Sequence, residues 1–348
     1  MSHLPVTPQE ITSDWLSDVL GESIRSVTLL DAHTGTTGRA VIEIDHDSER
    51  LPKRLFVKLP PTDEMQRHFV VSTGMGRNEV QFYKHLSDEL PVCVPHAYFA
   101  DASEDATQYI MLLEHLEDRG CTFRNARNRY GEAYLKEVLA VFARMHGAYW
   151  NSERFETDLQ WVTPPGRHEI AVPLIEKALA RHGEDMPPVF SEMANLYIEQ
   201  TDAVHNLWQT GTPTLIHGDV HDGNFYYDSD QPGLLDWAIV SRGPAMRDVA
   251  YFLTGSLRSE HQAWAKPLVE YYLQELSKHC TDAPSFDEIW QQFQWHAAYV
   301  WVGSTVTLAM GEEWQPVKYV LAGLKQIHVS MESLGSVNAI RNALTKAS

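Results

Sequence analysis

The sequence predicts an α+β fold with two lobes, an N-terminal lobe made of an antiparallel sheet plus a helix and a larger, mainly helical C-terminal lobe. Three observations support this fold class. The length of 348 residues fits two domains or one large bilobal one. Short runs of strand-like character fill the first third of the chain, and after residue 117 the apolar residues recur at helical spacing. We therefore expect lobes at 1–116 and 117–348, with a hinge near 114–117 and a ligand cleft between them.

The N-terminal lobe is expected to begin with a helix. Thr7, Pro8 and Glu10 form the pattern of a capping box with proline at the first helical position, and predict a helix that runs to about Leu20 and ends at Gly21. A further helix is expected at about 76–90. Strands are predicted at 26–31, 39–45, 54–59, 96–100 and 108–114.

The C-terminal lobe reads as helices with one interruption. Helical periodicity predicts helices at 131–150, 190–209, 260–279, 284–310 and 315–332. Only the stretch 214–239 again looks strand-like, with turns inside it. No internal repeat or low-complexity tract is visible, so the lobe is expected to be one mainly helical body.

Composition excludes several classes of partner. The chain has 28 Lys and Arg and 47 Asp and Glu, so the net charge is 28 − 47 = −19. This negative charge disfavours electrostatic binding to nucleic acid or to an anionic membrane. Three scattered cysteines offer neither a disulfide framework nor paired zinc-ligand spacing. The first ten residues lack a secretory signal, and no apolar run approaches the length of a membrane helix. We expect a cytoplasmic protein with no nucleic acid and no membrane as partner. The oligomeric state is left open.

One segment of the C-terminal lobe carries the most chemical information. An apolar strand leads into His217, Gly218 and Asp219, Asn224 follows five residues after Asp219, and a second short apolar stretch leads to Asp236. Phosphoryl transfer from a magnesium nucleotide needs a carboxylate that orients or deprotonates the acceptor hydroxyl, and hard oxygen ligands that hold Mg²⁺. The catalytic loop of protein kinases has this order and spacing, with His-Arg-Asp in place of His-Gly-Asp.

This loop, with its pattern His-Gly-Asp-x-His-x-x-Asn, resembles that of the aminoglycoside phosphotransferase and choline kinase superfamily of small-molecule kinases. Flanking segments at 77–83 (RNEVQFY), 145–150 (MHGAYW) and 243–253 are similar to its ecdysteroid kinase-like branch. The resemblance covers roughly residues 10–255. It implies a bilobal protein-kinase-like fold, with ATP and Mg²⁺ as cofactors and a hydroxyl group of a small molecule as phosphate acceptor.

The resemblance implies a role for each polar residue of the loop. Asp219 would be the catalytic carboxylate that positions the acceptor hydroxyl, and Asn224 and Asp236 would be the Mg²⁺ ligands. His217 is expected to support the loop by packing rather than by taking part in the chemistry. Asp248 would either anchor the loop from below or be an ordinary acid at a helix N-terminus.

The nucleotide half is assigned to the N-terminal lobe. Lys58 would hold the α- and β-phosphates, and Glu79, on a neighbouring helix, would orient it. A glycine-flanked loop would cover the phosphates, and backbone groups at the end of the last strand would bind adenine. These two segments contain Gly35, Thr36, Thr37, Gly38, Glu114 and Leu116. No G-x-x-x-x-G-K-[ST] occurs, which excludes a P-loop ATPase.

The acceptor is judged from the distribution of charge. No Asp or Glu follows Glu332, and the tail carries Arg341 and Lys346, so a polycation would lack acids there. An aromatic stripe either belongs to the core or lines a pocket for an apolar hydroxylated molecule. Its residues are Trp290, Trp295, Tyr299 and Trp301. We expect an apolar, lipid- or steroid-like alcohol, with an aminoglycoside or choline/ethanolamine-type kinase as the alternative. His221 and Asp222 either contact the substrate or face solvent.

Three rival classes are weighed against a small-molecule kinase. A pseudokinase that binds nucleotide without turnover would be expected to lack one of the four residues Lys58, Asp219, Asn224 and Asp236, and all are present. A protein kinase would need a longer activation segment than the twelve positions between Asp236 and Asp248. A metal phosphohydrolase would need further His and Asp ligands at matched spacing, which the sequence does not offer.

Overall fold

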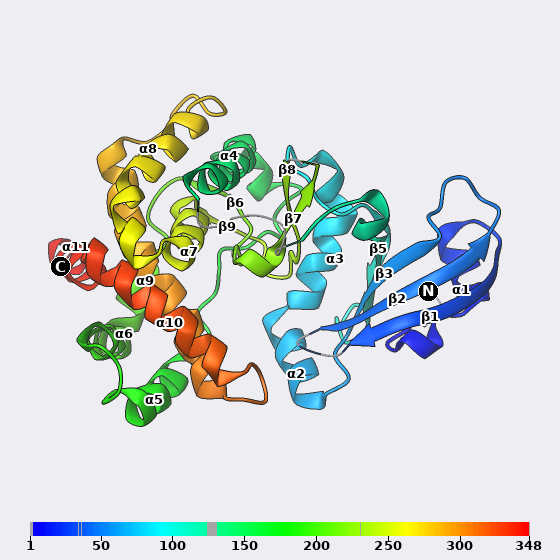
Figure 1. Ribbon diagram of the computed structural model, residues 1–348, viewed down its shortest axis with the longest axis horizontal. Helices are drawn as coiled ribbons and strands as arrows, with labels where there is room; N and C mark the ends of the chain where they lie inside the picture. The colour runs from blue at the N-terminus through cyan, green and yellow to red at the C-terminus, as the bar shows by residue number, and fades with distance from the viewer. Residues whose placement is uncertain (1–2, 34, 36, 124–130, 230, 348) are drawn as a thin grey trace. The chain divides into compact units, whose positions relative to one another are not determined.

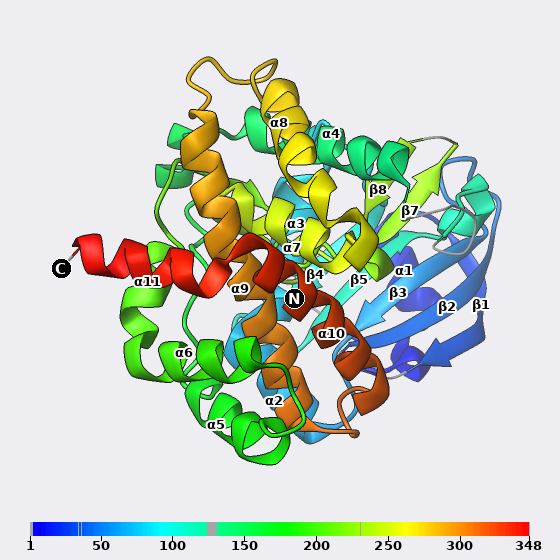
Figure 2. The same ribbon diagram turned by 60° about the vertical axis from the view of Figure 1, so that its left-hand side comes forward.

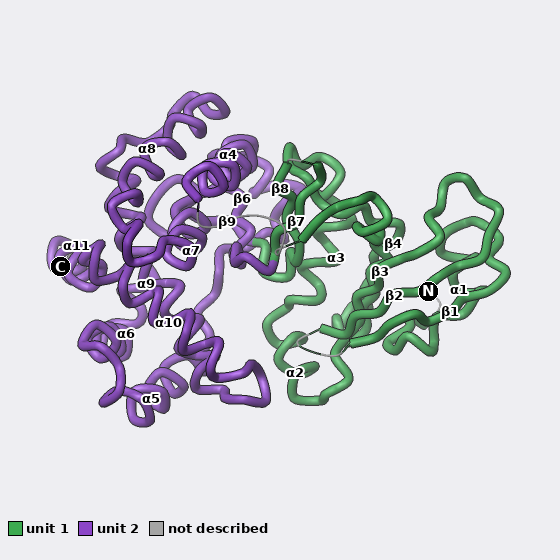
Figure 3. The backbone as a smooth tube through the Cα atoms, viewed as in Figure 1, with its two compact units in different colours: residues 1–126, 224–240 green, residues 127–223, 241–348 purple. Residues whose placement is uncertain are grey.

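The computed structural model (Figure 1) describes residues 3–33, 35, 37–123, 131–229 and 231–347. The chain forms two compact units (Figure 3). Unit 1 takes residues 1–126 and 224–240, and unit 2 takes residues 127–223 and 241–348. The expected lobes at 1–116 and 117–348 stay a prediction.

A hairpin far along the sequence is part of unit 1. It consists of β7 (Phe225–Asp228) and β8 (Gln231–Leu234), which pair with one another in antiparallel fashion. Tyr227 forms a β-bridge with Thr122, and Gly233 forms another with Cys93. These backbone bridges attach the hairpin to the N-terminal segment, which is why the chain returns to unit 1 after the catalytic-loop sequence.

Unit 1 is built on a five-stranded antiparallel sheet, whose strands lie in the order β1-β2-β3-β5-β4 (Figure 2). The strands are β1 (Ile24–His33), β2 (Gly38–His46), β3 (Arg54–Leu59), β4 (Ala97–Ala102) and β5 (Tyr109–Glu114). All five expected strands are therefore present, each within two residues of its predicted bounds. One face of the sheet is buried in a core that includes Ile42, Leu55 and Leu112, as the period-two patterning requires.

Three α-helices accompany the sheet: α1 (Ser13–Leu20), α2 (Glu64–Thr73) and α3 (Met75–His85). The helix expected from Thr7 is wrong in its start, because Thr7 gives only a 3₁₀ turn at Pro8–Glu10. The Thr7 hydroxyl donates to the Glu10 carboxylate and caps no backbone group, whereas the Thr12 side chain accepts from the backbone N–H of Trp15 and starts α1. The predicted end of the helix at Gly21 is confirmed by its left-handed φ of 67°.

The second predicted helix of unit 1 is shorter than expected. It ends at His85 and is followed by a 3₁₀ turn at Ser87–Glu89 rather than continuing to residue 90. α3 packs against β4 and β5. A Cβ on Gly76 would lie 2.3 Å from the Tyr109 ring, so glycine permits the close approach of α3 to β5.

Unit 2 is mainly helical, with one small antiparallel ribbon of β6 (Pro213–Ile216) and β9 (Ser241–Pro244). Its helices are α4 (Glu132–Ala148), α5 (Ala171–His182), α6 (Pro188–Leu207), α7 (Met246–Ser256), α8 (Ala265–Leu276), α9 (Phe286–Met310), α10 (Val317–Leu334) and α11 (Ser336–Ala347). α9 packs against α5, α7, α10 and α11, and is thus the central helix of the unit. The expected helix at 260–279 is a 3₁₀ turn at Ser259–Trp264 followed by α8.

The aromatic stripe on α9 contributes to the packing of unit 2. Trp301 is fully buried, and its indole N–H donates to His328 Nε2 at 3.2 Å. The Trp295 carbonyl accepts from the Trp208 indole at 2.9 Å, and Tyr299 packs edge-to-face on Trp208. Trp301 therefore belongs to the core, whereas the side chains of Trp290, Trp295 and Tyr299 are only partly buried. Within the described part of the chain, no helix is long and apolar enough to cross a membrane.

Candidate active site

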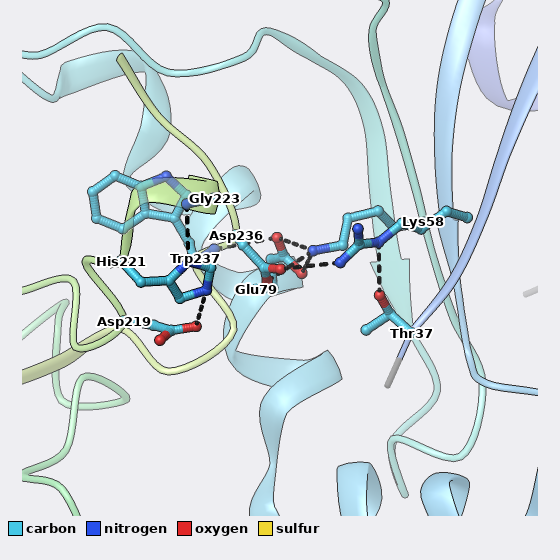
Figure 4. Close-up of polar contacts among 9 residues, drawn as sticks. Thr37, Lys58, Glu79, Asp219, His221, Gly223, Asp236 and Trp237 are labelled. Atoms are coloured by element: carbon cyan, nitrogen blue, oxygen red, sulfur yellow. Dashed lines mark hydrogen bonds and ion pairs between the residues drawn. The ribbon is translucent and has the colours of Figure 1, made fainter. Parts of the chain in front are cut away.

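Lys58 and Glu79 form a buried ion pair in unit 1. Lys58 lies on β3 and is 4% exposed, and Glu79 lies on α3 and is 1% exposed. The Lys58 Nζ is 2.6 Å from Glu79 Oε1 and 3.0 Å from Asp236 Oδ1 (Figure 4). Burial lowers the pKa of Lys58, but the charges of Asp236 and Glu79 outweigh it and hold that pKa above its ordinary value. The ammonium therefore stays charged.

The β7–β8 hairpin brings the two candidate Mg²⁺ ligands together. The backbone N–H of Leu235 donates to the Asn224 carbonyl at 2.9 Å, so Asn224 and Asp236 flank the open end of the hairpin. Asn224 is buried, and Asp236 has a left-handed φ of 62°, a conformation that Asp and Asn tolerate better than most residues. The backbone geometry thus holds Asp236 at the point where it meets Lys58.

A second cation reaches Asp236 from the neighbouring strand. Arg39 on β2 is directly opposite Lys58 in the β2–β3 ladder, so both side chains leave the same face of the sheet. Arg39 Nη2 is 3.5 Å from Asp236 Oδ2, and its side chain is half-exposed. The two Asp236 oxygens consequently face two different cations.

Trp237, the residue after Asp236, ties this segment to α3. Its backbone N–H donates to Glu79 Oε1 at 3.2 Å. Its ring stacks on Phe82, with the centroids 4.0 Å apart and the planes 7° from parallel. α3 therefore carries Glu79, the carboxylate that pairs with Lys58. It also contacts Trp237, the residue after Asp236, through Glu79 and Phe82.

The donor atoms at the hairpin suit Mg²⁺. An Asn amide and an Asp carboxylate offer the hard oxygens that Mg²⁺ prefers. Among the described residues, no group of three or more His, Cys, Asp or Glu side chains is arranged to hold a metal by itself. Mg²⁺ is commonly bound through one or two protein carboxylates together with substrate phosphates. Asn224 and Asp236 thus fit an ion that arrives with a nucleotide.

The expected phosphate-covering loop precedes β2. Thr36 lies outside the described residues. Thr37 is buried and its hydroxyl accepts from Arg39 Nε at 3.5 Å. Gly38 opens β2, where a Cβ would lie 2.8 Å from the Pro60 carbonyl oxygen, whereas a Cβ on Gly35 would meet only the Thr37 carbonyl oxygen, at 4.0 Å. A side chain at position 38 would therefore clash with the backbone just after β3, and glycine avoids this clash.

The expected adenine segment ends β5. The Glu114 carboxylate accepts from the backbone N–H of His96 at 2.8 Å and from Arg119 at 2.7 Å. The Leu116 carbonyl accepts from the backbone N–H of Cys121 at 3.1 Å and closes a 3₁₀ turn. The Glu114 side chain and the Leu116 carbonyl are thus used to shape the turn after β5.

In unit 2, Asp248 anchors the loop that carries Asp219. Its buried carboxylate, in the first turn of α7, accepts the backbone N–H groups of His217 at 2.8 Å and Gly218 at 2.9 Å. Gly218 has a φ of 85°, which the sharp turn requires. Burial raises the pKa of Asp248, but the hydrogen bond from His146, the nearby charges of His146 and His217, and the Gly218 N–H together hold that pKa below its ordinary value. Asp248 is therefore ionised.

Two histidines complete the support of this loop. His217 is fully buried, and its Nδ1 accepts from the backbone N–H of Asp219 at 3.2 Å. His146 on α4 lies between Asp248, at 3.3 Å, and the Tyr272 hydroxyl, at 2.8 Å. Both imidazoles lie behind the loop, in the packed interior of unit 2.

The Asp219 side chain is partly accessible, with a third of its surface exposed, and the neighbouring His221 side chain is half-exposed. The Tyr251 hydroxyl donates to Asp219 Oδ1 at 2.9 Å. His221 Nε2 is 3.6 Å from Asp219 Oδ2 (Figure 4). Asp222 accepts a longer hydrogen bond, of 3.4 Å, from the Tyr134 hydroxyl. The structure thus places His221 beside Asp219 and pairs Asp222 with Tyr134.

Sequence reasoning did not single out Tyr251, His146 and Arg39, although a signal existed for each. Tyr251 is three residues after Asp248, which puts both on one helix face. His146 lies within one of the flanking segments. Arg39 opposes Lys58 once the second and third strands are paired in register. Each signal needed a tertiary or pairing argument in addition to the motif.

Comparisons with known proteins identify relatives of this fold. Residues 35–287 match the model of the phosphotransferase enzyme family. The GDP complex of wild-type aminoglycoside 2'-phosphotransferase-IIIa is 13% identical, with 92% of this chain and 96% of that one covered and a TM-score of 0.53. The apoenzyme of macrolide 2'-phosphotransferase MphH from Brachybacterium faecium is 14% identical, with coverages of 89% and 96% and a TM-score of 0.50. No curated protein sequence matches significantly.

The likenesses to solved structures confirm the predicted fold class, a bilobal kinase-like fold with a sheet-based and a helical part. At such low identity they show the fold alone. The ecdysteroid kinase-like branch stays a prediction.

Proposed function

Because the chain belongs to the phosphotransferase enzyme family, we propose that it transfers the γ-phosphate of MgATP to a hydroxyl group of a small molecule. The observation that carries this proposal is the buried Lys58–Glu79 pair in contact with Asp236. A buried ion pair adds little net stability compared with apolar residues of the same size. Such perturbed, converging charges are typical of functional sites.

In this proposal unit 1 supplies the nucleotide half. Lys58 binds the α- and β-phosphates, and Glu79 fixes the direction of its ammonium group. Asn224 and Asp236 would hold Mg²⁺, which would supply positive charge against the phosphates. Since Glu79 also accepts the Trp237 N–H, it fixes the backbone next to Asp236 as well.

Two further segments of unit 1 are assigned to the nucleotide by the same proposal. Gly35, Thr36, Thr37 and Gly38 would cover the phosphates through backbone N–H groups. Backbone groups of the segment from Glu114 to Leu116 would bind adenine. The turn that Glu114 stabilises through His96 and Arg119 supports this assignment, because it keeps the end of β5 in a defined conformation.

Unit 2 supplies the acceptor half. Asp219 aligns the hydroxyl for in-line attack on the γ-phosphate, with positioning and electrostatics providing most of the acceleration. Asp248 and His217 hold the loop backbone and do not act on the substrate. The full burial of both residues is consistent with a structural role.

For the acceptor we propose an apolar, lipid- or steroid-like alcohol. The absence of acids after Glu332 supports it, because a polycation would need them there. Asp228, near the loop in sequence, is already paired with Arg119 at 3.2 Å. Among the aromatic residues of α9, Trp301 gives no support, because it is fully buried in the core. An aminoglycoside or choline/ethanolamine-type acceptor is the alternative.

The test is Mg²⁺-dependent ATP consumption against hydroxylated steroids, aminoglycosides, choline, ethanolamine and sugars. We expect Asp219→Asn to abolish turnover while MgATP affinity stays near native, and Lys58→Met to weaken MgATP binding. Near-native turnover of Asp219→Asn would refute the role of Asp219. Absence of Mg²⁺-dependent nucleotide binding would refute the kinase proposal, and binding without turnover of any acceptor would favour a pseudokinase. Turnover confined to aminoglycosides or choline would refute the apolar acceptor.

A further inference from the structure

One helix of unit 2, α7, reaches the loop of Asp219 twice. Asp248, in its first turn, accepts the backbone N–H groups of His217 and Gly218. Tyr251, three residues later on the same helix face, donates its hydroxyl to Asp219 Oδ1 at 2.9 Å. The same rigid element therefore contacts both the backbone and the side chain of the loop.

We propose that Tyr251 is a positioning residue, which fixes the orientation of the Asp219 carboxylate so that Oδ2 receives the acceptor hydroxyl. This inference rests on the proposed function. The terminal torsion of an Asp side chain is broad and roughly two-fold, so a carboxylate on a partly exposed loop samples many orientations unless it is held. The hydrogen bond to Oδ1 holds it, and Oδ2 is directed to the side where His221 lies.

The chemistry of a phenol suits this role. A neutral O–H donor orients a carboxylate without cancelling its charge, whereas a Lys or Arg at this place would compete with the acceptor for the same oxygens. Burial first, and then the charge of Asp219, raise the pKa of Tyr251 well above its ordinary value, so its hydroxyl remains a donor throughout the neutral range. The carboxylate therefore keeps its capacity to accept the hydroxyl proton at Oδ2.

Tyr272 provides a matched control within the same unit. It is a fully buried tyrosine, whereas Tyr251 is partly buried, and the Tyr272 hydroxyl contacts a polar group of the loop support, namely His146 Nδ1 at 2.8 Å. Its hydroxyl is linked to the loop through His146 and Asp248, whereas the hydroxyl of Tyr251 bonds the Asp219 carboxylate directly. Removing its hydroxyl tests general support of the loop, whereas removing that of Tyr251 tests the orientation of the carboxylate.

The experiment compares Tyr251→Phe, Tyr272→Phe, Asp219→Asn and the double variant Tyr251→Phe/Asp219→Asn. Turnover is measured as ATP consumption with the best acceptor of the panel, and MgATP affinity by calorimetry. We expect Tyr251→Phe to lower kcat by about 10- to 100-fold, since small misplacements at a reacting centre cost about that much. Tyr272→Phe should stay within about threefold of native, and MgATP affinity and Tm should be unchanged in Tyr251→Phe. Any residual turnover that Asp219→Asn shows at high enzyme concentration should not fall further in the double variant, because Tyr251 acts through that carboxylate.

The possible failures are distinguishable. If Asp219→Asn is inactive and Tyr251→Phe has near-native kcat, the inference is wrong and the proposed function stands. If Asp219→Asn keeps its activity, the proposed function itself loses its catalytic carboxylate. Equal losses in both tyrosine variants, a further loss in the double variant, or weakened MgATP binding in Tyr251→Phe would mean that the tyrosine only supports the fold, and would overturn the positioning role.

Discussion

Replacing Glu79 by alanine is expected to destabilise unit 1 strongly, because it removes one partner of a buried ion pair. Both Glu79 oxygens contact the Lys58 ammonium, and Oε1 also accepts the backbone N–H of Trp237. In Glu79→Ala the buried Lys58 keeps the quarter-exposed Asp236 as counter-charge, and the Trp237 N–H loses the Glu79 carboxylate as acceptor. The damage therefore has an electrostatic part and a hydrogen-bonding part.

The magnitude follows from these two parts. Removing one partner of a buried pair costs about 3–5 kcal/mol, and Asp236 places this case at the low end. An unsatisfied buried N–H adds about 1–3 kcal/mol. We therefore expect a loss of about 4 kcal/mol, since the two penalties overlap. Glu79→Gln keeps an acceptor for Trp237 and loses only the charge, so it should cost about 3 kcal/mol, the electrostatic part alone.

The assay has to report on unit 1. Of the ten tryptophans, only Trp15 and Trp237 lie in that unit, so fluorescence of the whole protein reports mainly on unit 2. Hydrogen exchange of peptides that cover β3 and α3 measures the opening free energy where the pair lies. The double variant Lys58→Met/Glu79→Gln removes both charges, and its loss should be smaller than the sum of the single losses by about 2 kcal/mol or more.

Additivity of Lys58→Met and Glu79→Gln, together with a loss below about 1 kcal/mol in Glu79→Ala, would refute the reasoning. It would mean that water, rather than the partner, satisfies each charge. A loss of about 4 kcal/mol in both Glu79→Ala and Glu79→Gln would instead assign the whole effect to charge and none to the Trp237 contact.

Two further predictions concern the folded state. Burial lowers the pKa of His328 from 6.5 to about 4. As the pH falls, the imidazole therefore binds a proton in the unfolded chain before it does so in the folded chain. The free energy of unfolding should fall between pH 6.5 and pH 4 by about 1.4 kcal/mol per pH unit. His328→Gln keeps an acceptor for the Trp301 indole and should remove this contribution to the pH dependence of stability, measured by acid unfolding. An unchanged slope of stability against pH would show that His328 is not its source. Gly38→Ala should cost about 1–3 kcal/mol, measured as the change in Tm, because its Cβ would meet the Pro60 carbonyl oxygen at 2.8 Å. Gly35→Ala is the control and should be neutral, and equal effects would refute the steric explanation.

The strands of unit 1 could be predicted because patterning determines them locally. The period-two alternation in β2 and the apolar run in β3 are properties of a few neighbouring residues. The helix expected from Thr7 failed for the opposite reason. Thr7 and Thr12 are both acceptable caps, and the choice of Thr12 depends on local geometry that the motif does not encode. The polar run of α2 offered no clear helical stripe.

The candidate site likewise has features that neighbouring residues determine and features that only the tertiary structure determines. The spacing of Asp219, Asn224 and Asp236 is a property of the chain, and a motif can find it. The hydrogen bond from Tyr251 to Asp219 joins residues 32 positions apart, and that from His146 to Asp248 joins residues 102 apart. Such contacts depend on which helix packs behind the loop, and a single sequence holds that information only through packing.

The charge balance around Lys58 explains why we propose MgATP, and not free ATP, as the cofactor. Lys58 and Arg39 carry two positive charges, and Glu79 and Asp236 carry two negative ones, so the cluster has no net attraction for a polyanion. A bare triphosphate would also meet the Asp236 carboxylate, and like charges at close range repel strongly in a partly buried setting. A divalent cation reverses this balance, because it adds two positive charges where Asp236 and the phosphates meet. Lys58 and Arg39 would remain the residues of this cluster that contribute positive charge towards phosphate oxygens. In this proposal the neutrality of the cluster is what makes nucleotide binding depend on Mg²⁺.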